Sequence, residues 1–317
     1  MTVARWLVVL CGIGIAVAGA LVIAGQAGSG AQPWDSELSD NFIFVKAIPF
    51  VLGLGVAVGL LRGRGAPPLR RPDGTVRRFT TGTVLGHWLI TIGFVLALPT
   101  GMWQYLGGIL DVRAPIDLFL FYRVHYIGGA IVLFSVAMFV TSWWLSGDRS
   151  LLPPRGAWRT HLVGAAQELP RAVGARAARL LRLDLGERVP PPQRFTYYET
   201  GLSFPTWAIA LTLITVTGVI KAMRYIVPVP GPILYWSSTL HVAAMVLIVI
   251  KVLDHLRYTL PRWPMMVAIV KGWVSEAGIR RVLTPSVPPS ALGERPVAGA
   301  EAPGAPTRAS AITGSDR

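Results

Sequence analysis

Six long apolar segments constrain this chain more than any other feature of its sequence. Each is long enough to cross a bilayer as a helix, which takes about 20 residues. They occupy roughly residues 6–25, 42–61, 82–105, 122–145, 204–225 and 236–257. Only 15% of the 317 residues are charged, compared with about 25% in soluble domains. We therefore expect an all-α integral membrane helical bundle.

The segments between the apolar runs alternate in charge. Residues 31–41 carry three acids and no base, residues 62–78 carry six arginines against one acid, and residues 146–194 carry nine arginines. Arginine-rich loops stay on the cytoplasmic side of a membrane. The two arginine-rich loops and the basic C-terminal part are thus predicted inside, and every span then alternates in direction. Because topology accounts for the net charge of +14, we expect no nucleic-acid binding.

Four of the five histidines lie in the predicted spans, where polar side chains are costly and usually functional. His87 and His255 lie near the inner ends of their runs, whereas His125 and His241 lie near the outer ends. They form two pairs at two depths, and each pair comes from two different helices. The fifth, His161, falls in the basic inner loop and is expected to be an exposed or interface residue.

The last apolar run carries one histidine of each pair. Fourteen positions separate His241 from His255, which is about four helical turns and about 21 Å along the axis. The two imidazoles then lie within about 40° of each other, on one face of the helix. Two partner helices would each supply one opposing imidazole. Neutral imidazole is a good ligand for haem iron, and two of them fill both axial positions. This arrangement indicates two bis-histidine b-type haems, one near each membrane surface.

Other kinds of chemistry find less support in the sequence. Cys11 is the single cysteine, which excludes cysteine-ligated iron–sulfur clusters and covalent haem attachment through two cysteines. A transporter with polar histidines in its core is an alternative, but it would usually need acidic residues within the spans. Asp254 is the only clear acid near a predicted span, and it lies at the end of that span. A structural anchor without haem is a third alternative, and the presence of all four histidines argues against it.

Four segments resemble the cytochrome b (gamma) subunit of respiratory formate dehydrogenases, within the wider membrane dihaem cytochrome b family. RFTTGTVLGHWLITIGFVLALPTGMW is similar to that family's first haem helix, and YRVHYIGGAIVLFSVAMFV is similar to its second. YYETGLSFPTWAIALTLITVTGVIKAMRYI resembles the third, and TLHVAAMVLIVIKVLDHLRY resembles the fourth. The resemblance covers about residues 80–281.

This resemblance implies that His87 and His255 bind an inner haem b, and that His125 and His241 bind an outer one. It also implies partner subunits: an iron–sulfur subunit and a molybdenum or tungsten catalytic subunit of formate dehydrogenase. Electrons would pass from them to menaquinone or ubiquinone at the bacterial plasma membrane, and the chain itself would not act on the fuel molecule. Related cytochromes serve hydrogenases and other molybdenum oxidoreductases, which are the alternative donors.

A quinone contact is implied at the inner start of the third helix, where the family has a YNAGQ-like motif. The matching residues are Tyr198, Glu199, Thr200, Gly201 and Leu202, so two polar positions of the motif differ here. Glu199 and Gly201 are the candidate quinone-binding residues, and Glu199 is a candidate proton acceptor. The alternative is that Glu199 is simply an acid at the positive end of a helix dipole.

The expected organisation has four parts. Residues 1–30 are a signal peptide or a first transmembrane helix, because their basic start, apolar run and small-residue exit suit both. Residues 31–79 form an additional transmembrane helix with a basic cytoplasmic loop. Residues 80–284 form the four-helix dihaem core, and the Pro/Ala/Gly/Ser-rich residues 285–317 are expected to be a disordered cytoplasmic tail.

Overall fold

Long helices account for most of the structure, a computed structural model that describes residues 3–28, 33–62, 71–110, 118–147, 149–190, 192 and 195–283. Six of them correspond to the six apolar runs: α1 (Val3–Gly28), α2 (Pro33–Arg62), α3 (Thr81–Leu110), α4 (Leu118–Ser146), α7 (Phe204–Met223) and α8 (Gly231–Thr259). All but α1 include a stretch long and apolar enough to cross a membrane, and α1 is apolar over Val3–Val17. The predicted all-α membrane bundle is confirmed.

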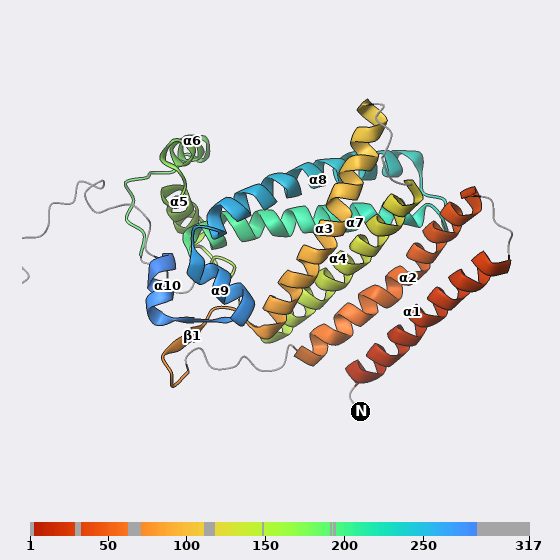
Figure 1. Cartoon of the computed structure of the whole chain (residues 1–317). Helices are drawn as coiled ribbons and strands as arrows, with labels where there is room; N and C mark the ends of the chain where they lie inside the picture. Colours follow the sequence, from red (N-terminus) through yellow and green to blue (C-terminus); the bar gives the residue numbers. More distant parts are fainter. Residues whose placement is uncertain are drawn as a thin grey trace, which may run out of the picture. The chain divides into compact units, whose positions relative to one another are not determined.

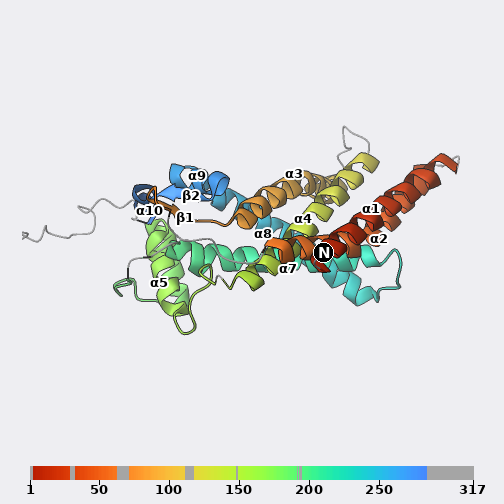
Figure 2. The same ribbon diagram turned by 90° about the horizontal axis from the view of Figure 1, so that it is seen from below.

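The long helices form two groups (Figure 1). Helices α1, α2, α4 and α3 lie side by side in that order, and α7 and α8 form a pair that crosses them. Contacts of α2 and α4 with α7, and of α3 with α8, join the two groups. The view from below shows the same neighbours (Figure 2). Helices α3, α4 and α8 carry the four paired histidines, and together with α7 they meet in one bundle.

Glycines on α2 allow it to approach α4 closely. A Cβ atom at Gly55 would lie 2.6 Å from the carbonyl oxygen of Phe134, and one at Gly59 would lie 2.8 Å from that of Met138. Helix association in lipid depends on such close packing, because lipid tails are as apolar as the side chains. A buried cluster then connects α2, α4 and α7: Val45, Ile48, Leu133 and Ala222.

Short elements gather at one end of the bundle, where α3 begins and α8 ends (Figure 1). They are the helices α5 (Trp158–Glu168), α6 (Arg171–Leu181), α9 (Trp263–Lys271) and α10 (Glu276–Leu283), and the strands β1 (Thr75–Arg77) and β2 (Trp273–Ser275). The strands pair antiparallel, with Val76 opposite Val274. These two strands were not predicted from the sequence, since three residues are too few to show a strand period.

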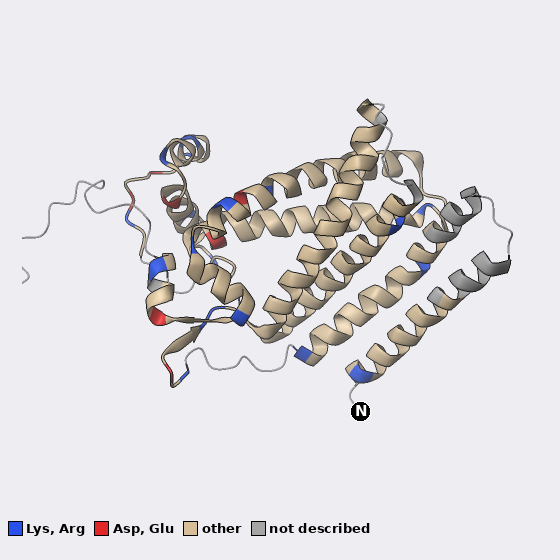
Figure 3. Ribbon diagram, viewed as in Figure 1, with Lys and Arg blue, Asp and Glu red and all other residues tan. Residues whose placement is uncertain are grey.

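Charged residues are concentrated at this end and at the ends of the long helices, and few occur along the middle of those helices (Figure 3). Helix α7 is entered through a π-helical turn, η1 (Glu199–Ser203); such turns often occur at functional sites. The proposed boundaries at residues 30, 79 and 284 remain predictions. The tail predicted to be disordered, residues 285–317, lies outside the described residues.

Candidate functional site

The two inner histidines come from different helices, and their rings lie close together. His87 comes from α3 and His255 from α8, and their ring centroids are 6.1 Å apart with an angle of 47° between the ring planes. Trp207 of α7 packs edge-on against His255 with centroids 6.3 Å apart, and Trp88 packs against His87 in the same way. The structure therefore brings together the two histidines predicted to share the inner site.

The inner pair has the spacing that two ligands of one iron need. With a metal–nitrogen bond of about 2 Å and about 1 Å from nitrogen to ring centre on each side, two imidazoles on one metal lie about 6 Å apart, centre to centre. The Nδ1 atom of His87 is buried and has no hydrogen-bond partner among the described residues. Buried polar atoms normally have a partner, so the described residues do not hold the His87 ring at Nδ1, and the spacing of the two rings carries the fit. The inner pair fits a b-type haem.

The outer histidines line a single cavity of about 410 Å³. His125 enters it from α4 and His241 from α8, α3 and α7 complete most of the wall, and α2 contributes Phe44. Sites for cofactors and drug-sized ligands usually measure about 300–1,000 Å³. Lys221 and Arg224 also line the cavity, and such cations suit the carboxylates of a haem. Lys221 was not predicted from the sequence as a residue of this site.

Both outer imidazoles are held through Nδ1 by the helix that precedes their own. The Nδ1 atom of His125 lies 2.9 Å from the carbonyl oxygen of Ala97 and 3.3 Å from the Thr100 hydroxyl. The Nδ1 atom of His241 lies 3.0 Å from the Thr217 hydroxyl. Histidines that bind metals usually donate their second ring N–H to such a partner. The outer pair also fits a b-type haem.

The two histidine pairs lie at different depths. His241 and His255 both belong to α8, which runs without interruption from Gly231 to Thr259. At about 1.5 Å per residue their fourteen-residue separation is about 21 Å along the axis. One helix thus contributes one imidazole to each pair.

The two predicted quinone contacts lie in η1, and both already have protein neighbours. The Glu199 carboxylate accepts hydrogen bonds from the fully buried Arg78 at 2.6 and 2.7 Å and from the Thr196 N–H at 2.8 Å. A Cβ atom at Gly201 would lie 2.5 Å from the carbonyl oxygen of His161. These contacts give both residues a structural role, and their contact with quinone stays a prediction.

Helix α5 holds the start of η1 through hydrogen bonds that were not predicted from the sequence. His161 lies 2.7 Å, through Nδ1, from the Thr200 hydroxyl, and Glu168 accepts the N–H groups of Tyr197 and Tyr198 at 3.0 and 2.8 Å. Burial lowers the pKa of His161 and raises the pKa of Glu168. These contacts join segments about 30 to 40 positions apart in the sequence, which no local pattern signals.

A cluster of charged and hydroxyl side chains adjoins the inner pair. Asp254, next to His255, accepts hydrogen bonds from Lys251 at 3.1 Å, from Arg257 at 2.8 Å and from the Tyr198 hydroxyl. Lys251 is buried. The sequence placed Lys251 and Asp254 beside His255, whereas the link to Tyr198 appears only in the folded chain.

Comparison with known proteins places this arrangement in a family. Residues 78–266 match the family model described as prokaryotic cytochrome b561. That range is more than half of the chain and includes all four paired histidines. Neither the curated proteins nor the solved structures contain a significant match. The chain therefore belongs to the prokaryotic cytochrome b561 family, and it is a multi-pass bacterial membrane protein of the kind that transfers electrons through b-type haem.

Proposed function

We propose that this chain is the membrane electron-transfer subunit of a respiratory oxidoreductase and that it holds two b-type haems, one per histidine pair. The observation that carries the proposal is the placement of the four histidines. His87 and His255 have ring centroids 6.1 Å apart, and His125 and His241 line one cavity about four helical turns away along α8.

The chain's residues would serve this function in distinct ways. His87 with His255, and His125 with His241, would each hold one haem iron through two imidazoles, which would favour electron transfer over substrate chemistry. Bound haem supplies a one-electron carrier at each depth. Lys221 and Arg224 provide positive charge in the outer cavity.

The electron donor we propose is formate dehydrogenase, through an iron–sulfur subunit and a molybdenum or tungsten catalytic subunit. The support is the resemblance of four helical segments to its cytochrome b subunit. A hydrogenase or another molybdenum oxidoreductase would suit the same four-histidine frame. Affinity purification of the chain from its native membrane tests this choice, because the catalytic subunit that copurifies identifies the donor.

The acceptor we propose is menaquinone or ubiquinone, bound at the inner side near Glu199 and Gly201. Tyr198, the residue before Glu199, donates a hydrogen bond to Asp254, the residue before His255. A quinone oxygen there would have to share the donors Arg78 and Thr196 with the Glu199 carboxylate. Reoxidation of the reduced protein by a soluble quinone analogue tests this part of the proposal.

The central experiment measures haem content and reduced-minus-oxidised spectra of the protein purified in detergent after haem-replete expression. We expect two low-spin b-type haems per chain. His87→Ala and His255→Ala should remove the same spectral component, because each leaves one iron with a single imidazole. His125→Ala and His241→Ala should remove the other component.

A matched control is His161→Ala, which removes a histidine outside both pairs and should keep both components. Purification without haem would contradict the proposal. If the single variants His87→Ala and His125→Ala removed the same spectral component, the histidine pairs would be assigned wrongly.

A further inference from the structure

The two outer histidines meet the same dipeptide, threonine followed by glycine, on the preceding helix. Thr100 and Gly101 of α3 contact His125, and Thr217 and Gly218 of α7 contact His241. We propose that these dipeptides are positioning residues for the outer site: each threonine fixes the proton on Nδ1, and each glycine makes room for the ring. The inference rests on the proposed dihaem function and deepens it.

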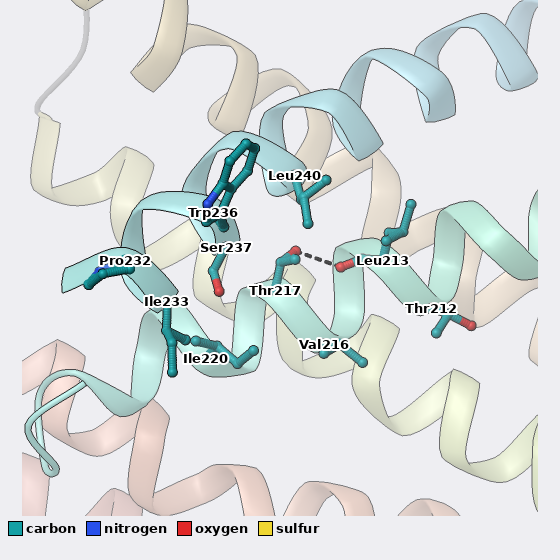
Figure 4. Close-up of a pocket in the computed structure, with 10 residues that line it drawn as sticks. All are labelled: Thr212, Leu213, Val216, Thr217, Ile220, Pro232, Ile233, Trp236, Ser237 and Leu240. Carbon is teal, nitrogen blue, oxygen red and sulfur yellow. Dashed lines mark hydrogen bonds between the residues drawn. The ribbon is translucent and has the colours of Figure 1, made fainter. Parts of the chain in front are cut away.

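The direction of the threonine hydrogen bonds determines which imidazole nitrogen carries the proton. The Thr100 hydroxyl donates to the Leu96 carbonyl at 2.7 Å, and the Thr217 hydroxyl donates to the Leu213 carbonyl at 2.5 Å (Figure 4). A hydroxyl has a single hydrogen, so each threonine oxygen is left to accept from the imidazole. Nδ1 then carries the hydrogen, and the lone pair of Nε2 is free for a metal.

At His125 a backbone carbonyl assigns the same proton independently. Three residues before Thr100, the Ala97 carbonyl oxygen lies 2.9 Å from Nδ1 of His125. A carbonyl oxygen can only accept, so Nδ1 of His125 is the donor.

The glycines matter because each ring lies directly against the backbone. A Cβ atom at Gly101 would lie 2.9 Å from Cε1 of His125, and one at Gly218 would lie 3.2 Å from Cε1 of His241. The first distance is an overlap and the second is tighter than usual contact. A side chain at either position would push the imidazole away from its threonine.

Other threonines and histidines of the chain distinguish the positioning role of Thr100 and Thr217 from ordinary helix packing. Thr206, on the same helix as Thr217, also donates to the carbonyl four residues earlier, at 2.8 Å, and no hydrogen bond joins it to a histidine among the described residues. The inner ligand His87 has no Nδ1 partner in the described part of the chain. A threonine followed by a glycine against the imidazole ring thus marks the outer pair. Thr200 also lies against Nδ1 of His161, but a Cβ atom at Gly201 would meet the His161 backbone.

The test compares Thr217→Val, Thr217→Ser and Thr206→Val in redox titrations of the purified haem-loaded protein. Valine has the shape of threonine but cannot accept from Nδ1–H, so the imidazole becomes a weaker donor and the ferric state loses stabilisation. We expect the outer midpoint potential to rise. A tenfold loss in the ferric-to-ferrous affinity ratio corresponds to about 59 mV for one electron. Thr217→Ser should keep the outer potential of the unaltered protein, because serine retains the hydroxyl. Thr206→Val should leave both midpoint potentials unchanged.

Equal shifts in Thr217→Val and Thr206→Val, or no rescue by serine, would overturn the proposal and leave only a packing role. Should Thr217→Val not assemble, Gly101→Ala and Gly218→Ala provide the second test. They are expected to shift or remove the outer spectral component with the inner one intact, and two unchanged components would overturn the proposal. Failure of the dihaem assignment itself is distinguishable, because the unaltered protein would then lack one component.

Discussion

Single residues in this protein show how polar groups are accommodated beside and within an apolar bundle. The clearest case is the buried Arg78, whose Nη2 donates to both carboxylate oxygens of Glu199. Removing one partner of such a buried pair usually costs about 3–5 kcal/mol, because the remaining charge is left unpaired. This pair joins the segment before α3 to the start of α7, and it therefore stabilises the end of the bundle that carries the inner histidines.

His161 makes the stability of this end dependent on pH. Burial lowers its pKa from the ordinary value of 6.5, so between the lowered pKa and 6.5 the unfolded chain binds more protons than the folded chain. Stability then rises with pH in this window and is lost as the pH falls below about 6.5. We expect the native protein to lose stability over this range relative to His161→Gln, which does not titrate. Thermal unfolding in detergent at a series of pH values measures this, and parallel profiles would contradict it.

Pairs of helices approach each other where small residues permit it. Helix α2 lies outside the region that matches the family model, yet Gly55 and Gly59 pack it directly on the α4 backbone, and Phe44 reaches the outer cavity. Tyr126 of α4 also stacks on Phe44 with ring centroids 4.8 Å apart and donates a hydrogen bond to Asn41. The additional helix is therefore an integral part of the outer half of the bundle.

Gly55→Ala tests this packing at the scale of the helix pair. The new Cβ would lie 2.6 Å from the Phe134 carbonyl oxygen and 2.8 Å from the Ala137 Cβ, and backbone cannot move aside as a side chain can. We expect a loss of about 1–3 kcal/mol in the free energy of unfolding. Gly12→Ala is the control, because nothing lies within 4 Å of a Cβ there. Denaturant unfolding in detergent compares the two, and equal stabilities would contradict the close approach.

The arginine-rich loops predict the orientation of the whole molecule in the membrane. Cysteine labelling tests it, since Cys11 is the single native cysteine and can be replaced by alanine. Val227→Cys lies between α7 and α8, and Arg155→Cys lies between α4 and α5. A membrane-impermeant maleimide should label only the first in intact spheroplasts and both after permeabilisation, because basic loops stay inside. The reverse pattern would exchange the inner and outer histidine pairs.

Much of the site follows from the sequence because its signals are local or additive. An apolar run of about 20 residues specifies a membrane helix wherever it occurs, and helical periodicity places His241 and His255 on one face of α8 without knowledge of its neighbours. Loop charge gives each span a direction. Together these signals define which histidines share a depth, and the structure brings His87 beside His255 and places His125 and His241 in one cavity.

The sequence by itself therefore determined the membrane helices, their expected directions and the two depths of the histidines. Only the tertiary structure decided which side chains hold those histidines. Thr100 is 25 positions from His125, and α5 and η1 meet through His161 and Thr200, 39 positions apart. Such contacts depend on helix crossing angles and on where glycine lets two backbones approach. These are properties of two surfaces packed together, and no period or charge pattern within one segment specifies them.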